Sequence, residues 1–231
     1  MVLFSLVLFS ACSSVLAWSG AGHMVIAGIA YKELSTDTKG KVNVLLKSHP
    51  DYPKWANSFK GAEAGMDLET YVFLRASTWP DEIRRKNNAY DHPQWHYIDY
   101  PLRPTKFKME EPESHDNDIL VGLAQSEKVL ADATASAESR AAHLSWLEHL
   151  VGDIHQPLHC ASYFSAEFPK GDKGGNSFYV KPATRGIKLH SLWDGLLGTR
   201  NQPKTQLDDA IRIRSEHPKA SLNLGSPLPK E

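Results

Sequence analysis

The segment from Trp146 to His159 constrains the fold of this chain more than any other. It reads Trp-Leu-Glu-His-Leu-Val-Gly-Asp-Ile-His-Gln-Pro-Leu-His. Apolar residues recur at helical spacing, which predicts an amphipathic helix over residues 136–154. Pro157 cannot continue that helix, because it has no N–H to donate and its ring clashes with the preceding turn. The sequence therefore predicts a central helix that ends in a turn.

Two candidate metal ligands project from one face of this helix. His149 and Asp153 are four residues apart, so their side chains point in the same direction. His159 follows the turn and can fold back toward them. A second pair with the same spacing, His190 and Asp194, opens another predicted helix. One such pair often forms only a salt bridge on a helix, but two pairs with a further histidine provide the donors from which zinc sites are built.

The composition fits one globular domain without a general affinity for nucleic acid. The chain has 231 residues, of which 41% are hydrophobic and 23% charged, and its formal net charge is −1. This length suits one domain, or at most two small ones. The near-zero charge provides no basic field to hold nucleic acid. Bound zinc ions would add positive charge locally, so nucleic acid is not excluded as a substrate.

Residues 1–17 form an apolar segment that ends in small residues. This pattern predicts a secretory signal peptide cleaved after Ala17, and hence a secreted or periplasmic protein. The segment is too short to span a membrane, so we expect no membrane span. A buried N-terminal helix and a lipoprotein anchor at Cys12 are the alternatives. Cys160 is the cysteine that remains after cleavage, so no internal disulfide is expected; it is interpreted as a buried thiol, with a ligand beside His159 as the alternative.

Cleavage after Ala17 would also create an N-terminal ligand. Trp18 would begin the chain, with His23 shortly after it and two glycines between them. A free α-amino group has a pKa of about 7.7–8.0 and binds metal once it is deprotonated. Trp18 can therefore offer its amine and its carbonyl oxygen beside His23. A frayed terminus with a surface histidine is the plain alternative.

The rest of the chain is predicted to consist of helices joined by loops. Pro80, with Asp81 and Glu82 after it, suits the first turn of a short helix. The aromatic residues 95–100 predict an extended segment that carries His96. A proline-rich run over residues 49–53 is expected to end the second helix, and a glycine-rich connection over residues 162–181 to lie close to the site. Apolar periodicity and capping residues predict the other helices, over residues 23–34, 35–46, 67–77, 117–133 and 205–215.

Together these motifs resemble one known family. Trp18 with His23, Trp-Pro-Asp-Glu-Ile-Arg at 79–84, His-Tyr-Ile-Asp at 96–99, the central segment and His-Ser-Leu-Trp-Asp at 190–194 follow the order found in zinc-dependent single-strand-specific nucleases of the S1/P1 type. The resemblance extends from Trp18 to about Gly198 and includes every ligand position. Family members usually continue with further helix, so the C-terminus is expected to be shortened. The lack of a disulfide favours a bacterial member.

The resemblance implies an all-α fold of the zinc phospholipase C and single-strand nuclease type. One mostly helical domain over residues 18–231 would hold three zinc ions as a trinuclear cluster in a cleft. The implied ligands are Asp81, His96, His149 and Asp153 for the first zinc; His159, His190 and Asp194 for the second; and the Trp18 amine and carbonyl, His23 and the bridging Asp153 for the third.

The same resemblance implies a monomeric endonuclease that hydrolyses single-stranded DNA and RNA to 5′-phosphorylated products and also acts on 3′-nucleotides. Asp81 and Asp153 would have catalytic roles as metal ligands, and Arg84 would stabilise charge on the phosphorus; a helix salt bridge is the alternative for Arg84. Tyr97 and Asp99 match the family's base-stacking and base-binding positions, although Tyr97 could equally pack in the core. Asn176 is the remaining candidate for substrate binding.

Zinc phospholipase C is the competing class, because it shares the helical fold and the cluster. Its last ligand is typically glutamate, whereas this chain has Asp194. The segment around Asp81 and Arg84 also favours the nuclease. A metal-binding module without activity is a third, non-enzymatic possibility.

Overall fold

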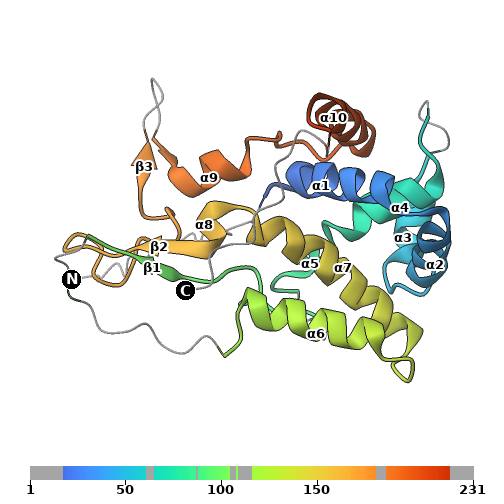
Figure 1. The fold of residues 1–231 in the computed structure, drawn as a ribbon, viewed down its shortest axis with the longest axis horizontal. Helices are drawn as coiled ribbons and strands as arrows, with labels where there is room; N and C mark the ends of the chain where they lie inside the picture. Colours follow the sequence, from blue (N-terminus) through green and yellow to red (C-terminus); the bar gives the residue numbers. More distant parts are fainter. Residues whose placement is uncertain are drawn as a thin grey trace, which may run out of the picture.

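The described part of the chain is mostly helical, which confirms the predicted fold class (Figure 1). The computed structural model describes residues 18–60, 65–86, 88–104, 108, 116–180 and 186–218. Its helices are α1 (Gly20–Glu33), α2 (Thr36–Leu46), α3 (Tyr52–Ser58), α4 (Leu68–Ala76), α5 (Trp79–Ile83), α6 (Ile119–Ala131), α7 (Ala137–Ile154), α8 (Pro157–Cys160), α9 (Leu189–Asp194) and α10 (Pro203–Glu216). Its strands are β1 (Tyr100–Leu102), β2 (Ala161–Tyr163), β3 (Tyr179–Val180) and β4 (Ile187–Lys188). The predicted signal peptide lies outside the described residues.

Helix α7 crosses the centre of the molecule, and α6 lies alongside it (Figure 1). The side chain of Ser136 accepts a hydrogen bond from the N–H of Ser139, which satisfies one of the free donors in the first turn of α7. The two helices approach closely at Gly122 of α6. A Cβ on this residue would lie 2.8 Å from Leu150 Cδ1 and from Trp95 Cγ, so only glycine fits.

Helix α1, which carries His23, packs against α4 and α10. Its contact with α10 is close at Gly28, where a Cβ would lie 2.9 Å from the Cβ of Ala210. Leu207 and Ala210 of α10 are buried in this contact region. Helix α10 therefore holds α1, and with it His23, against the rest of the fold.

The core contains large aromatic side chains. Trp95 and Trp146 meet edge to face, with 5.1 Å between ring centroids, which is a favourable arrangement for an aromatic pair. Trp95 Nε1 also donates to Asn117 Oδ1 at 2.8 Å, so its polar atom is satisfied. Leu144 and Leu150 of the apolar pattern that predicts α7 are also buried, whereas Val151 is 40% exposed. The buried tryptophans of the described residues are Trp55, Trp79, Trp95 and Trp146.

Two short sheets supplement the described helices. Strands β1 and β2 are parallel, with Tyr100 opposite Ala161, and β3 and β4 form an antiparallel pair. Strand β1 follows His96 in the chain, and β2 follows His159. The N–H of Ile98 donates to the carbonyl of His159 at 2.8 Å. Pairing of these strands therefore brings together two histidines that are far apart in the sequence.

Most predicted helices are confirmed close to their predicted ends, but one helix was not predicted and one local prediction is wrong. The proline-rich run over residues 49–53 does more than end a helix, because Pro53 lies in the first turn of α3, where a missing N–H has no cost. Residues 95–100 are not extended throughout, since His96 lies in a turn and the strand begins at Tyr100. Within the described ranges, no helix has both the length and the apolar character needed to cross a membrane.

Candidate metal centre

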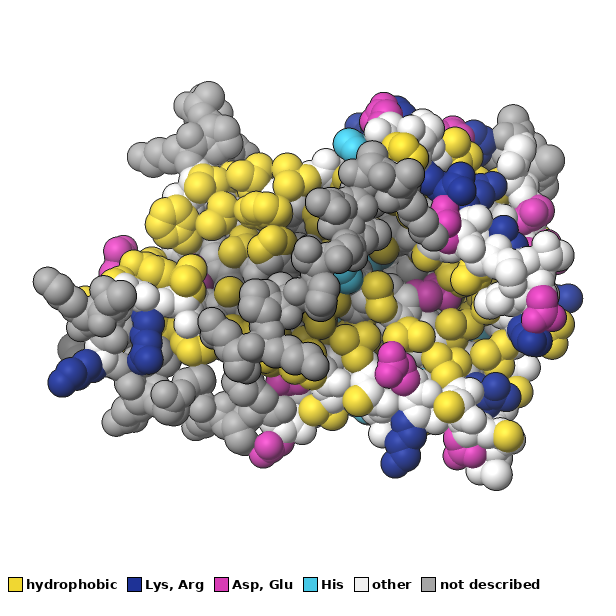
Figure 2. All heavy atoms as spheres, in the orientation of Figure 1, with side chains coloured by type: hydrophobic (Ala, Val, Ile, Leu, Met, Phe, Trp, Pro, Cys, Tyr) yellow, Lys and Arg dark blue, Asp and Glu magenta, His cyan; other side chains and the backbone are white. Residues whose placement is uncertain are grey.

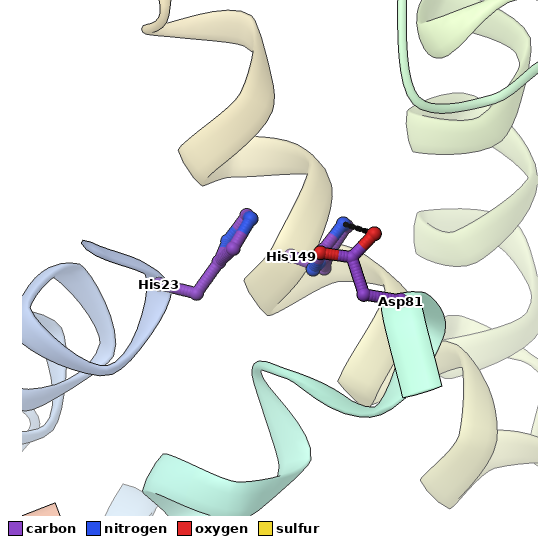
Figure 3. Close-up of side chains that lie close together, drawn as sticks. All are labelled: His23, Asp81 and His149. Atoms are coloured by element: carbon purple, nitrogen blue, oxygen red, sulfur yellow. Dashed lines mark ion pairs between the residues drawn. The ribbon is translucent and has the colours of Figure 1, made fainter. Parts of the chain in front are cut away.

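Three groups of His and Asp side chains meet beside α7. In each group the possible donor atoms lie within 4.8 Å of one another. Figure 3 shows one group, in which His23 from α1, Asp81 from α5 and His149 from α7 point toward one another. Every candidate ligand except Trp18 thus belongs to a group. The groups are His23, Asp81 and His149; His96, His149 and Asp153; and His159, His190 and Asp194.

Asp153 connects the first two groups. Its carboxylate oxygens lie 3.2 Å from His96 Nδ1, 3.2 Å from His149 Nε2 and 3.3 Å from His23 Nε2. Asp81 Oδ1 lies 3.8 Å from the same nitrogen of His96 and 3.9 Å from that of His149. Tetrahedral zinc bonds of about 2.0–2.1 Å separate neighbouring donor atoms by about 3.3 Å. The observed separations therefore suit donors that share metal ions.

The third group joins α8 to α9. His159 Nε2 lies 3.1 Å from His190 Nε2, and the latter lies 3.6 Å from Asp194 Oδ2. The predicted spacing of His190 and Asp194 on one helix face is thus realised. Cys160 belongs to none of the three groups, because its Sγ donates to the carbonyl of Ile154 at 3.1 Å. The donors of the described groups are therefore nitrogen and oxygen.

Backbone carbonyls orient three of the histidines. Each carbonyl accepts from an Nδ1–H, so the lone pair of Nε2 is left to face the cluster. This is the usual way in which a protein fixes the orientation and tautomer of a metal-binding imidazole. The carbonyls belong to Ser77 for His149, His96 for His159 and Gly174 for His190, at 2.8, 2.5 and 2.6 Å.

Several donor atoms in the cluster are buried without a hydrogen-bond partner among the described residues. They are both ring nitrogens of His23, His96 Nε2, Asp81 Oδ1 and Asp153 Oδ1. A buried polar atom left unsatisfied costs free energy. A metal ion would use the lone pairs of His23 Nε2, Asp81 Oδ1 and Asp153 Oδ1, which face other donors of the cluster. A donor set of imidazoles and carboxylates suits zinc. The residues present therefore fit the predicted metal.

Burial sets the charge of the cluster. It lowers the pKa of His23 and of His96 to about 4, which keeps both rings in the neutral form that binds metal. Burial would also lower the pKa of His149, but the charges of Asp153 and Asp81 outweigh it and raise this pKa to about 9. Burial would raise the pKa of Asp153, but His149 holds it well below its ordinary value. A bound metal would take over the positive charge of His149.

Gln156 is a residue of the site that the sequence patterns do not single out. It is fully buried, and its Nε2 donates to Asp194 Oδ1 at 2.8 Å. Burial raises the pKa of Asp194 to about 8, and the hydrogen bond from Gln156 opposes that shift. Its Oε1 accepts from the N–H of Leu158 at 2.6 Å. A polar side chain between Asp153 and His159 in the central segment is the signal that could have identified it.

Trp18 lies next to the cluster. Its indole Nε1 donates to the carbonyl of Gly152 at 3.0 Å. The next residue, Ser19, donates its N–H to the carbonyl of Asp194 at 2.9 Å. These contacts hold the start of the described chain between α7 and α9, beside Asp153.

The three residues assigned to phosphate and base lie together at the edge of the cluster. Arg84 Nη1 is 3.9 Å from Asp81 Oδ1. Burial raises the pKa of the Tyr97 phenol, the charge of Asp99 raises it further and that of Arg84 lowers it, so both charges are close to the ring. Tyr97 is 40% exposed, which argues against the core-packing alternative.

The glycine-rich connection lies against the third group, as predicted. Gly174 has φ +59°, and a Cβ there would lie 2.1 Å from the carbonyl oxygen of Leu158. Only glycine permits this approach, which brings the Gly174 carbonyl to His190. Asn176 Nδ2 donates to the carbonyl of Lys173 at 2.9 Å and so supports the loop. A role of Asn176 in substrate binding stays a prediction.

Comparison with known proteins agrees with this geometry. The sequence model of the S1/P1 nuclease family matches residues 18–222. Endonuclease 4 of Arabidopsis thaliana is 26% identical over 233 residues, which covers 94% of this chain and 67% of that protein. Nuclease P1 of Penicillium citrinum is 24% identical over 180 residues (77% of this chain, 57% of that protein), and Nuclease S1 of Aspergillus oryzae is 25% identical over 184 residues (77% and 53%). The chain thus spans only 53% to 67% of the length of these relatives. Because the family match covers most of its length, the chain belongs to the S1/P1 nuclease family.

Proposed function

We propose that this chain is a zinc-dependent phosphodiesterase that cleaves single-stranded DNA and RNA to 5′-phosphorylated products and also acts on 3′-nucleotides. The observation that carries the proposal is the meeting of three His and Asp groups at one buried site. Membership of the S1/P1 nuclease family supports the same reaction class. Two relatives are named Nuclease P1 and Nuclease S1, which supports nucleic acid as the substrate.

The separations between donor atoms support three zinc ions. Asp153 lies within 3.3 Å of nitrogens from three histidines, as a carboxylate that bridges two metals would. His23 also groups with Asp81 and His149, which suits adjacent first and third zinc ions. The proposed ligands are Asp81, His96, His149 and Asp153 for the first zinc; His159, His190 and Asp194 for the second; and the Trp18 amine and carbonyl, His23 and Asp153 for the third.

The chain's own residues would bind and orient the substrate around these metals. Bound zinc would supply an activated water and neutralise negative charge on the phosphate. Arg84, beside Asp81, would donate to phosphoryl oxygens as their charge grows in the transition state. The exposed ring of Tyr97 offers a stacking surface for a base, and Asp99 can accept a hydrogen bond from an amino group on the base edge. A base held in a duplex cannot reach these groups, which explains a preference for single strands.

Secretion would complete the third zinc site. We include in the proposal the removal of residues 1–17, because only a free Trp18 amine can serve as a ligand. The contacts of Trp18 with Gly152 and of Ser19 with Asp194 support this arrangement, since they hold the new N-terminus beside Asp153. We propose that the active protein is a secreted or periplasmic monomer.

A combined metal and activity measurement tests this proposal. Protein that begins at Trp18 is analysed for zinc content, and the same sample is assayed on single-stranded DNA and RNA for 5′-phosphorylated products. Bound zinc with cleavage that a chelator abolishes is the expected result. Bound zinc with hydrolysis of a phosphatidylcholine analogue, and no cleavage of nucleic acid, would show that the chain is a phospholipase and not a nuclease. Zinc without either activity would reduce the chain to a metal-binding module.

A further inference from the structure

The arginine at the edge of the metal centre does not belong to a basic surface. In Figure 2, the Lys and Arg side chains of the described residues lie scattered among Asp and Glu side chains and form no basic stripe on the face in view. The formal net charge of the chain is −1. A phosphate at the metals would therefore depend on single cations at fixed positions rather than on a general field. The backbone that positions Arg84 then bears directly on the reaction.

Arg84 lies just beyond α5, where the hydrogen bonds of the helix no longer hold the chain. It is the C-terminal cap of this helix, with φ −51° and ψ 130°. Its N–H donates to the carbonyl of Asp81 at 3.4 Å, which holds the backbone before it. The peptide between Arg84 and Arg85 comes after the helix. A partner from another segment is needed to fix the orientation of this peptide.

Asp91 provides that partner. Its Oδ2 accepts a hydrogen bond from the N–H of Arg85 at 2.8 Å. Arg85 has φ +60°, in the left-handed region that residues other than glycine rarely adopt. Such a conformation persists only where the surrounding structure enforces it. A hydrogen bond to a carboxylate is stronger than one between neutral groups, so Asp91 can hold the chain in this conformation.

The loop that carries Asp91 is anchored to the helix of the metal ligands. We call residues 88–91 the 88–91 loop. Asn88 Oδ1 accepts from the N–H of Tyr90 at 2.9 Å, and the Asn88 carbonyl accepts from the N–H of Asp91 at 3.0 Å. The Tyr90 carbonyl accepts from Nε1 of the buried Trp146 at 3.0 Å. Trp146 lies on α7, which also carries two of the candidate ligands. The 88–91 loop therefore has a fixed position relative to those ligands.

We propose that Asp91 is a positioning residue for Arg84. By holding the N–H of Arg85, it fixes the peptide that follows Arg84 and so aims the guanidinium at a phosphate beside Asp81, whose Oδ1 lies 3.9 Å from Arg84 Nη1. The inference rests on the proposed function, because that function gives Arg84 its role. Asp91 acts on the reaction only through Arg84.

A double-mutant cycle tests whether Asp91 acts through Arg84. The zinc-loaded proteins begin at Trp18 and are the unmodified chain, Asp91→Ala, Arg84→Ala and the double variant. Their kcat and KM are measured on single-stranded DNA, and their zinc content by elemental analysis. Asp91→Ala should lower kcat by about 10- to 100-fold, because a misplacement of about 1 Å can cost that much. KM and zinc content should not change, since the lost interaction belongs to the transition state.

The same change in the Arg84→Ala background should have no further effect on kcat, because two residues that act as one unit are not additive. A second loss of equal size in that background would show that Asp91 acts independently of Arg84, and would overturn the proposal. An unchanged kcat in Asp91→Ala would also overturn it.

Two further variants separate the hydrogen bond from general stability. Asp91→Asn keeps an oxygen that can accept from Arg85 N–H, and should recover most of the kcat lost in Asp91→Ala. Arg85→Gly in the Asp91→Ala protein should also recover much of it, because glycine adopts a positive φ without strain. Arg85→Ala in the same background removes the same charge but keeps the strain, and should recover nothing. Equal recovery with glycine and alanine, or a loss in Asp91→Asn as large as in Asp91→Ala, would contradict the positioning role.

Asp132→Ala is the matched control for Asp91→Ala. Asp132 Oδ1 also accepts from a backbone N–H, that of Thr134 at 2.8 Å. It lies at the C-terminal end of α6 and belongs to none of the three ligand groups. Asp132→Ala should keep kcat. A loss equal to that in Asp91→Ala would show that any weakened loop lowers the activity, and the specific role of Asp91 would fall.

Binding of orthovanadate distinguishes this inference from the proposed function. Vanadate can become five-coordinate, as phosphorus does in the transition state, so its affinity reports on transition-state contacts without any cleavage. Isothermal titration calorimetry measures it for the four proteins of the cycle. Weaker, non-additive binding in Arg84→Ala and Asp91→Ala, with no cleavage of nucleic acid by any protein, would support the positioning role and remove the nuclease. Cleavage by the unmodified protein with additive losses in the variants would leave the nuclease and remove the positioning role.

Discussion

Gln156 and Asp194 are joined in the protein interior by a hydrogen bond of 2.8 Å from Nε2 to Oδ1. The other end of the same amide accepts from the N–H of Leu158 at 2.6 Å. One side chain thus fixes the start of α8, which carries His159, relative to the last candidate ligand on α9. The amide also occupies one oxygen of Asp194 and leaves Oδ2, which faces His190, for a metal.

Replacing Gln156 with Leu should weaken zinc binding by the third group. Loss of a group that orients a metal ligand typically costs about 10–100-fold in metal affinity. Competition with a chromogenic chelator measures the affinity of each zinc ion. Gln206→Leu is the matched control, because Gln206 is also buried and its Oε1 accepts from the N–H of Gln202, away from the cluster. Equal zinc affinity in Gln156→Leu and the unmodified protein would show that Gln156 does not position a ligand.

Arg84→Ala should lower kcat by about 10²–10³ while the zinc content is kept, since the guanidinium would act on charge that develops in the transition state. Steady-state kinetics on single-stranded DNA, with elemental analysis of the same sample, measures both quantities. The neighbouring Arg85→Ala, which removes an equal charge from an exposed position, should keep kcat within about twofold. An undiminished kcat in Arg84→Ala would exclude this residue from the reaction.

A single extra residue at the N-terminus should remove one zinc ion. Two proteins are compared, one that begins at Trp18 and one that begins at Ala17. In the longer protein the nitrogen of Trp18 is an amide, which does not bind zinc at neutral pH, so the site at His23 loses a ligand. Elemental analysis should give a lower zinc content for the chain that begins at Ala17. Equal zinc content in both would show that the amine is not a ligand.

His49→Phe should reduce the loss of stability in acid. His49 is 2% exposed, stacks on Trp55 at 4.4 Å and accepts from the N–H of Asp51 through Nδ1. Burial lowers its pKa from 6.5 to about 3, against a smaller opposing effect of Asp51. Between these values the unfolded chain binds a proton that the folded chain does not. The free energy of unfolding should therefore fall with decreasing pH by about 1.4 kcal/mol per unit from this group alone.

Urea unfolding at pH 7.5 and pH 5.0 checks this prediction for both proteins. The metal ligands titrate in both, so the difference between the two pH dependences isolates His49. The variant should be less stable at the higher pH by about 1 kcal/mol, because Phe cannot accept the hydrogen bond. Equal pH dependences would show that the pKa of His49 is the same in the folded and the unfolded protein.

Gly174→Ala should destabilise the protein and reduce its zinc content. The new Cβ would lie 2.1 Å from the Leu158 carbonyl oxygen, at φ +59°, so the loop must move and take with it the carbonyl that holds His190. Thermal unfolding and elemental analysis measure the two effects. Gly40→Ala in α2 is the control: nothing lies within 4 Å of its Cβ, so the change should stabilise the helix by about 0.5–1 kcal/mol. A normal zinc content in Gly174→Ala would show that the loop does not support the ligand.

The sequence predicts the elements with strong local signals. Ser136, followed by regularly spaced apolar residues, specifies α7 from its cap onward. The pair His149 and Asp153 has the spacing of one helix face, and the structure brings both to the cluster. These features depend on residues that are close in the chain, so a local pattern contains the information.

Contacts between distant segments are not predictable in this way. The parallel pairing of β1 with β2 involves three-residue strands that are separated by α6, α7 and α8. The carbonyls that orient His149, His159 and His190 belong to the backbone, which every residue has, so no residue type indicates them. The sequence does not predict helix α3, because it contains Pro53. A proline in the first turn of a helix cannot be distinguished from a proline that ends a helix when only the sequence is known.

The contact of α1 with α10 has a consequence for the stage of synthesis at which the chain can bind zinc. Gly28 and Ala210 hold the first described helix against the last one. On the ribosome, His23 emerges early, but α10 can cover α1 only when nearly the whole described chain has been synthesised. The partner ligands of His23, from Asp81 to Asp153, also emerge over that interval. We therefore expect the nascent chain to bind zinc weakly until α10 has emerged and packed on α1.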